Sequence, residues 1–293
     1  MAEQDGRVPG GSGSPTAPRL ILGTQLQRFR EAAKVSPEEA GYRIRASRSK
    51  ISRMENGRVG FKERDVADLL TLYGVTEPET RSHVLSLVGL ANATSWWSRY
   101  DEVLPDWFES YLGLESAASV IRSFELQFVP GLFQAEDYAR AVALLGPGAM
   151  PGEETDQRVA LRLRRQDLLR RPEPPHVWAV LDEGVLRRPL GGREVMRAQI
   201  DRLVEVADMP HVTLQVMPFG RGGHAAAGGS FSMLRFEDVG VPDIVYLEHL
   251  AGAVYLDKQE DVALYAGVMD RLGAKALTPP QTRRFLAQVR DET

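Results

Sequence analysis

Residues 36–57 fit two short helices joined by a tight turn, and this segment constrains the fold more than any other. Ser36, which is followed by a proline and two glutamates, has the pattern of a helix N-cap with a capping box. Ser47 begins a second helix, which ends at Asn56-Gly57. The apolar positions of the two helices can share one core, and they are Ala40, Ile44, Ile51 and Met54.

The second of these helices, SRSKISRMENG at residues 47–57, has an outward face suited to reading DNA. At 100° per residue, Ile51 and Met54 face the core, and the serines, Arg53 and Asn56 point away from it. Hydroxyl, amide and guanidinium groups bind base edges and phosphates in a major groove. The predicted DNA-contacting residues are Arg43, Arg45, Ser47, Arg48, Ser49, Lys50, Ser52, Arg53, Asn56, Arg58 and Lys62. A solvated polar face that binds nothing is the alternative interpretation.

Apolar periodicity extends this pair to a five-helix domain over residues 19–92. The helix before the pair has an apolar series at Leu22, Leu26, Phe29 and Ala33. The helix after the pair has a second series at Val66, Leu69, Leu70 and Tyr73. Residues 1–18 lack such a pattern, and we expect them to form a disordered arm.

Charge is distributed unevenly along the chain. The formal net charge is -4, yet residues 19–75 hold twelve Lys and Arg against seven Asp and Glu. Residues 1–18 contribute -1, so the remainder of the chain carries -8. A basic module on an acidic body is expected when one domain binds phosphates and the other does not.

The rest of the chain changes its hydrophobic period near residue 173. Residues 93–172 are predicted to be a helical linker or dimerisation segment, and residues 173–293 a mixed α/β regulatory domain. The predicted strands are 177–182, 212–217, 230–236 and 243–248, and the predicted helices are 194–208, 258–272 and 279–290. The first two strands, with the helix between them, suggest a right-handed parallel crossover. The chain is therefore expected to be multidomain, with an all-α domain before a mixed one.

Candidate sites in the later domain are weaker. Arg221 and His224 lie in the glycine-rich loop at 220–229, and Glu248 is the last residue of a predicted strand. They are interpreted as ligand or partner contacts, although a plain hairpin connection and structural roles explain them too. The basic residues of 158–171 either contact DNA or an acidic partner, or form a solvated face. Because no catalytic or metal-ligand spacing is evident, we expect no enzyme, no metal and no cofactor.

Cysteine is absent, which excludes disulfides and thiolate chemistry and is typical of a reducing cytoplasm. No apolar run is long enough to span a bilayer, and no signal-peptide pattern begins the chain. We therefore expect a cytoplasmic protein without a membrane partner.

Residues 22–58 resemble the phage-repressor-like helix-turn-helix family, also called the xenobiotic-response-element type. The resemblance rests on the core pattern S-x-S-x-I-S-x-x-E-N-G. Two positions depart from the family: Arg45 replaces a turn glycine, and Pro37 replaces a glutamine that contacts phosphate. Arg45 is expected to need a left-handed or distorted backbone, at a cost of roughly 1 kcal/mol.

The segments SVIRSFELQFVPGLFQAEDYARAV (119–142) and LDEGVLRRPLGG (181–192) resemble a second domain of unknown function. It occurs in large helix-turn-helix regulators of filamentous, GC-rich bacteria, and the likeness covers about residues 100–290. Such genes commonly lie beside one for a very small protein and are described as antitoxin-like or developmental regulators. The resemblance implies a regulator with a small co-encoded protein as partner.

Together these features predict a sequence-specific transcriptional regulator. We expect a homodimer that reads a pseudo-palindromic operator in double-stranded DNA, because one module covers only a half-site. Its C-terminal domain would dimerise and sense a ligand or a small protein. Two alternatives remain open: an antitoxin-like protein that neutralises a co-encoded partner, and an enzyme tethered to DNA.

Overall fold

The computed structural model describes residues 17–92, 96–146, 149–237 and 242–293. The chain divides into two compact units, Met1–Ser95 and Trp96–Thr293. Most of the predicted arm at 1–18 lies outside the described residues, but its last two residues already belong to a helix.

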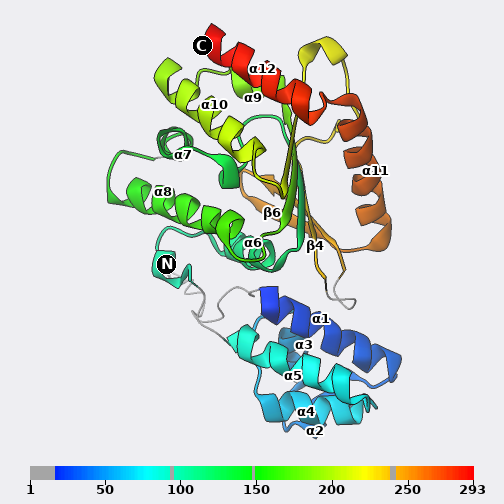
Figure 1. The fold of residues 1–293 in the computed structure, drawn as a ribbon. Helices are drawn as coiled ribbons and strands as arrows, with labels where there is room; N and C mark the ends of the chain where they lie inside the picture. Colours follow the sequence, from blue (N-terminus) through cyan, green and yellow to red (C-terminus); the bar gives the residue numbers. More distant parts are fainter. Residues whose placement is uncertain (1–16, 93–95, 147–148, 238–241) are drawn as a thin grey trace, which may run out of the picture. The chain divides into compact units, whose positions relative to one another are not determined.

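The first unit contains the five predicted helices (Figure 1). They are α1 (Ala17–Ala32), α2 (Pro37–Arg43), α3 (Arg48–Glu55), α4 (Glu63–Leu72) and α5 (Pro78–Asn92). The core predicted for α2, α3 and α4 is confirmed, since its apolar side chains are all buried. On α1 the prediction was wrong at two positions, because Phe29 is half-buried and Ala33 is exposed beyond the helix end. The buried residue there is Arg30, which pairs with Glu55.

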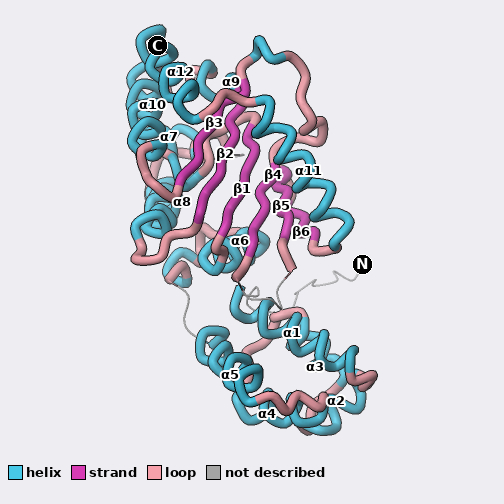
Figure 2. Tube along the Cα trace, turned by 45° about the vertical axis from the view of Figure 1, so that its right-hand side comes forward, coloured by secondary structure: helices cyan, strands magenta, loops and turns pink. Residues whose placement is uncertain are grey.

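The second unit is built on one six-stranded sheet with the order β3-β2-β1-β4-β5-β6 (Figure 2). Its strands are β1 (Val120–Glu125), β2 (His176–Asp182), β3 (Val212–Met217), β4 (Phe231–Arg235), β5 (Ile244–His249) and β6 (Gly252–Leu256). The pairs β1–β2 and β2–β3 are parallel, whereas β1–β4, β4–β5 and β5–β6 are antiparallel. This mixed sheet confirms the predicted fold class.

Two strands were not predicted from the sequence. β1 interrupts the segment 93–172, and it was missed because polar residues occupy three of its six positions. β6 is a short strand with no clean alternation. The loop at 220–229 is also not a hairpin connection, because it joins β3 at one edge of the sheet to β4, which lies beyond β2 and β1.

Helices cover both faces of this sheet. α11 (Gln259–Lys275) lies against one face, as Figures 1 and 2 show. The opposite face carries α6 (Asp106–Ala117), α7 (Glu136–Ala143), α8 (Glu153–Arg165) and α10 (Arg193–Ala207). α12 (Pro279–Glu292) packs against α10 and β3, and α9 (Glu183–Arg187) follows β2.

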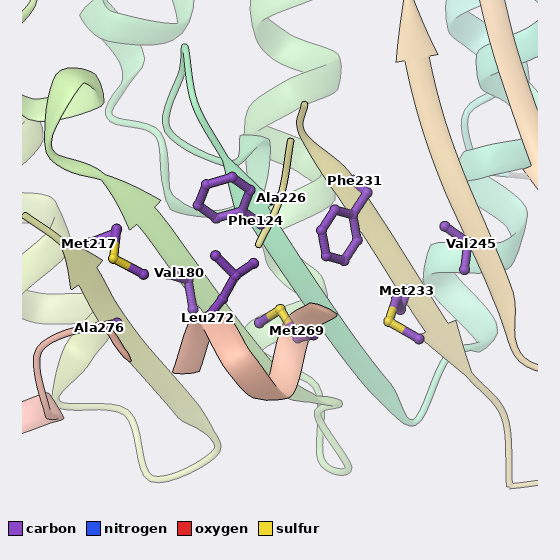
Figure 3. Close-up of a cluster of buried hydrophobic side chains, with 10 residues drawn as sticks. All are labelled: Phe124, Val180, Met217, Ala226, Phe231, Met233, Val245, Met269, Leu272 and Ala276. Atoms are coloured by element: carbon purple, nitrogen blue, oxygen red, sulfur yellow. The ribbon is translucent and has the colours of Figure 1, made fainter. Parts of the chain in front are cut away.

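The core between α11 and the sheet is apolar. Phe124, Phe231 and Met233 project from the strands toward Met269 and Leu272 of α11 (Figure 3). All five side chains are at most 5% exposed. Burying each such side chain contributes about 1.5–3 kcal/mol, which fixes α11 on the sheet.

The opposite face is held by a buried ion pair. Nε and Nη2 of Arg165 on α8 donate to the carboxylate of Glu115 on α6 at 2.9 and 2.8 Å, and the guanidinium lies over the rings of Phe108 and Tyr111. Although burial disfavours the charged form, the charge and hydrogen bonds of Glu115 raise the pKa of Arg165. Arg165 therefore stays charged, and its two hydrogen bonds to Glu115 join the two helices.

We predict that Arg165→Gln lowers the free energy of unfolding of the second unit by about 3–5 kcal/mol, because Glu115 would be left charged and buried. The matched control is Arg164→Gln on the same helix, where an exposed side chain pairs with Asp167. Its effect should be below about 1 kcal/mol. Urea denaturation followed by tryptophan fluorescence measures both variants, and equal losses would contradict the assignment.

Candidate nucleic-acid interface

Helix α3 packs directly on α1. A Cβ added at Gly23 of α1 would lie 2.5 Å from the carbonyl oxygens of both Met54 and Glu55. Such a contact is sterically impossible, so only glycine permits this approach. Ile51 and Met54 complete the contact, each 1% exposed. The sequence argument had placed these two residues toward the core, and the structure confirms it.

An ion pair fixes the last turn of α3. Nε and Nη2 of Arg30 donate to the two carboxylate oxygens of Glu55 at 2.6 and 3.0 Å, and Nη1 donates to the carbonyl of Val35 at 3.1 Å. The hydrogen bond to Glu55 raises the pKa of Arg30. Both side chains are largely buried, at 10% and 8% exposed. Glu55 therefore makes an intramolecular pair and holds the angle at which α3 is presented.

The turn between α2 and α3 has the geometry expected from the sequence. Arg45 adopts φ 54°, the left-handed conformation predicted for a position usually held by glycine. The N–H of Ala46 donates to the carbonyl of Gly41 at 2.8 Å, and the N–H of Arg45 donates to that of Tyr42 at 3.2 Å. These two bonds form a Schellman motif, which ends α2 and turns the chain toward α3.

The start of α3 is capped as predicted. The Ser47 hydroxyl accepts from the N–H of Lys50 at 3.2 Å and lies 2.9 Å from the hydroxyl of Ser49. On α2, the Ser36 hydroxyl accepts from the N–H of Glu39 at 3.1 Å, with Pro37 in the first turn. Ser47 is thus used mainly to begin the helix, whereas Ser49 stays exposed beside it.

The outward face of α3 is exposed at the positions expected from helical geometry. Ser49, Ser52, Arg53 and Asn56 are all exposed. The amide nitrogen of Asn56 donates to the carbonyl of Ser52 at 2.7 Å, which orients its side chain along the helix end. These groups offer donors and acceptors to a groove without first breaking core contacts.

Three of the predicted cations already bind carboxylates within the unit. Lys50 pairs with Asp65 of α4 at 3.2 Å and is half-buried. The other two pairs are Arg43 with Asp68 at 3.4 Å and Arg48 with Glu38 at 3.0 Å. The pairs of Arg43 and Arg48 are exposed and contribute about 0–1 kcal/mol each, so phosphates can replace their carboxylates at small cost.

The other four predicted cations have no such partner. Within residues 17–92, the structure gives no ion pair or side-chain hydrogen bond to Arg45, Arg53, Arg58 and Lys62, and all four are exposed. Arg45 lies just before α3, and Arg53 lies on its outward face. Arg58 lies just after its end, and Lys62 lies in the loop that leads to α4. These guanidinium and ammonium groups are free to bind phosphates or bases.

One surface residue was missed in the sequence analysis. Tyr42 on α2 is 88% exposed and directly precedes Arg43. An aromatic side chain on the polar side of a short helix was the signal that could have identified it. Its hydroxyl can donate to a phosphate beside the cations of the turn.

The structure separates the residues suggested as a ligand site in the second unit. The His224 ring packs on Phe124 at 4.9 Å, on the α11 side of the sheet, and Arg221 is exposed nearby in the chain. Glu248 accepts from the hydroxyl of Tyr246 at 3.0 Å, on the opposite face. Glu248 therefore cannot act together with the other two.

The basic residues at 158–171 do not form one surface. Arg158 and Arg164 make exposed pairs on α8, whereas Arg165 is buried against α6. Arg162 is half-buried and donates to Gln134 at 3.1 Å, and burial lowers its pKa to about 10. A single acidic partner could not contact all of them.

Comparison with known proteins identifies both units. A family model described as a helix-turn-helix domain matches residues 21–83. A second model, described as a domain of unknown function (DUF5753), matches residues 108–288. Neither the curated proteins nor the solved structures contain a match. Among the helices of the described ranges, none is long and apolar enough to cross a membrane.

We predict that Arg45→Gly stabilises the first unit and weakens DNA binding. Glycine removes the left-handed strain of about 1–2 kcal/mol but gains freedom in the unfolded state, which leaves a net increase of roughly 0.5–1 kcal/mol. Lys34→Gly is the matched control, because Lys34 has φ 56° at the end of α1 and is not a predicted contact.

Thermal unfolding and DNA titration measure the two effects in both variants. Both glycine variants should melt at a higher temperature, and only Arg45→Gly should lose DNA affinity. Unchanged affinity in Arg45→Gly would remove Arg45 from the interface.

Proposed function

The chain belongs to the family of the domain of unknown function DUF5753 and carries a helix-turn-helix domain before it, and from this premise we propose that it is a sequence-specific transcriptional regulator. We assign its helix-turn-helix to the phage-repressor-like, xenobiotic-response-element type. The second unit, in this proposal, acts by binding and not by catalysis.

The observation that carries the proposal is the rigid presentation of α3. One side of the helix is locked by the Arg30–Glu55 pair and the close approach at Gly23, and the other side is exposed and polar. A helix that enters a major groove needs both properties, because base contacts require a fixed register on the duplex.

The exposed cations divide into two roles. Arg53 lies in the middle of the outward face, where a guanidinium can bind O6 and N7 of a guanine with two hydrogen bonds. Arg45, Arg58 and Lys62 lie before or after the helix, where they can bind the phosphate backbone of DNA whose major groove holds α3. Arg43, Arg48 and Lys50 can join them by exchanging their carboxylate partners.

We propose a homodimer that reads two half-sites. A single α3 covers one half-site, and specific affinity in this class usually needs two, about one helical turn apart. The second unit would supply dimerisation, because the apolar faces of the first unit are used in its own core.

The second unit would also control DNA binding through a ligand or a small co-encoded protein. Its acidic composition keeps it away from phosphates, and its size exceeds what dimerisation requires. A ligand shifts DNA affinity only through different affinities for two states, typically with a coupling of about 1–3 kcal/mol. An antitoxin-like role is the same mechanism with a protein as the ligand.

We predict that Arg53→Ala loses specific affinity, whereas Lys62→Ala weakens specific and non-specific binding alike. The loss in Arg53→Ala should be about 1–3 kcal/mol on selected DNA and much smaller on random DNA. Lys62→Ala should lower the slope of log affinity against log salt by about one unit. Competition titrations over a range of salt concentrations measure both effects. The same ratio of specific to non-specific affinity in both variants would refute the division of roles.

We also predict that a fragment ending at Ser95 is folded, monomeric and poor at operator binding. The fragment corresponds to the first compact unit and retains all of its core residues. Analytical ultracentrifugation and circular dichroism test this expectation against the full chain. If the fragment sedimented as a stable dimer, dimerisation would have to be assigned to the helix-turn-helix unit.

A further inference from the structure

The two edges of the sheet in the second unit differ in what covers them. At the β3 edge, the N–H of Val216 donates to the hydroxyl of Thr282 at 3.1 Å, and its carbonyl accepts from the N–H of Leu277 at 2.8 Å. α12 also packs against this strand, so the β3 edge is closed to further pairing. β6 forms the other edge of the sheet, as Figure 2 shows.

The outer side of β6 carries backbone groups that are open to pairing. The turn between β5 and β6 has two residues, so Gly252 bonds to His249 and every second residue after it also bonds to β5. Ala253 and Tyr255 therefore direct their N–H and C=O groups to the free edge. Within the described ranges, neither residue makes a backbone hydrogen bond on that side. A row of such groups is a template for another strand.

β6 lacks the features that commonly keep an edge strand from pairing, which are charged side chains, proline and bulges. Residues 250–256 contain no charge and no proline. The register with β5 has no bulge, because each residue of β6 lies opposite one partner. Apolar side chains are exposed here too: Leu250 is 102% exposed and Val254 is 43% exposed. The edge is therefore apolar and unprotected.

The sequence of β6 is complementary to a second copy of itself. In an antiparallel pair centred on Val254, Ala253 lies opposite Tyr255 and Gly252 lies opposite Leu256. Each large side chain then meets a small one, and Val254 meets Val254 of the second copy. Ala253 and Tyr255 of the two copies exchange backbone hydrogen bonds, because these two residues carry the outward groups.

Charges beside β6 permit the same pairing. In this register Asp257 falls opposite Ala251 and Lys258 falls opposite Leu250, so no like charges meet. An antiparallel pair of identical strands also has twofold symmetry by construction. Twofold symmetry is what the proposed reading of two half-sites requires.

We propose that β6 pairs antiparallel with β6 of a second copy of this chain, with the twofold axis at Val254. The two sheets then form one continuous sheet across the dimer. Val254 lies opposite Leu247 of β5, which packs on the core under α11, so the two valines meet on the α11 side. The role of this dimer in operator reading rests on the proposed function, whereas the pairing itself is measured without DNA.

Opposite charges at position 254 test both the pair and its centre. Val254→Lys and Val254→Glu each place like charges opposite each other, and each should weaken dimerisation of the full chain at least about tenfold. A mixture of the two variants should form a heterodimer, because the charges at the axis then attract. Analytical ultracentrifugation and native mass spectrometry measure both results. Leu145→Lys is the matched control, since Leu145 is 58% exposed after α7, and it should dimerise as the parent does.

A cysteine at the axis measures contact directly. The chain has no cysteine, so Val254→Cys can form a disulfide only between two copies. Opposite residues that do not exchange hydrogen bonds lie about 4.5 Å apart between Cα atoms, within reach of a disulfide. Ala253→Cys is the matched control, because an offset of two residues separates its Cα atoms by about 8 Å, beyond that reach. Oxidation should cross-link Val254→Cys rapidly and Ala253→Cys poorly.

Several results would overturn the pairing. They are parental dimerisation in both charge variants, a mixture of the two that stays monomeric, and a parent that is monomeric at micromolar concentration. If a charge variant failed to fold by circular dichroism, the cysteine variants would still decide, and equal cross-linking of both would count against the axis at Val254. DNA selection is scored separately: a chain that pairs through β6 but enriches no DNA motif would refute the proposed function alone.

Discussion

The buried pair between Arg30 and Glu55 is the interaction on which the recognition surface depends. Glu55 is the last residue of α3, so the pair fixes the C-terminal end of this helix to α1. Gly23 brings the α1 backbone close enough for the pair to form beneath the helix. Removing Arg30 would leave Glu55 buried without its cation, at a cost of about 3–5 kcal/mol. Exposed serines and arginines are common on protein surfaces. Those of α3 differ because the opposite side of their helix is fixed against α1.

Much of this interface could be predicted from the sequence because local rules determine it. Helical spacing placed Ile51 and Met54 inside and Arg53 outside, and the missing turn glycine predicted the left-handed backbone at Arg45. The buried position of Arg30 could not be predicted, because a charge is buried only when a partner far along the chain meets it. The ion pairs that occupy half-exposed cations such as Lys50 depend on the same tertiary contacts.

The second unit shows the same limit more strongly. Apolar strands and amphipathic helices were readable, but β1 was not, because polar residues occur on both of its faces: Arg122 on the α11 side, and Ser123 and Glu125 on the other. Glu248 was singled out together with His224, but the structure places them on different sides of the sheet. The His224 ring packs on Phe124 on the α11 side, whereas Glu248 accepts from Tyr246 on the opposite side. Strand order decides which residues meet, and it cannot be read from spacing along the chain.

Within residues 17–92, the first unit therefore offers solvent four exposed cations without a carboxylate partner: Arg45, Arg53, Arg58 and Lys62. The central claim is that α3 reads a DNA sequence. Selection of bound fragments from a random duplex pool by the full chain tests this most directly. The account predicts enrichment of an inverted repeat whose half-site centres lie about 10 base pairs, or one helical turn, apart. A bound pool with no enriched motif, at a salt concentration where binding persists, would contradict it.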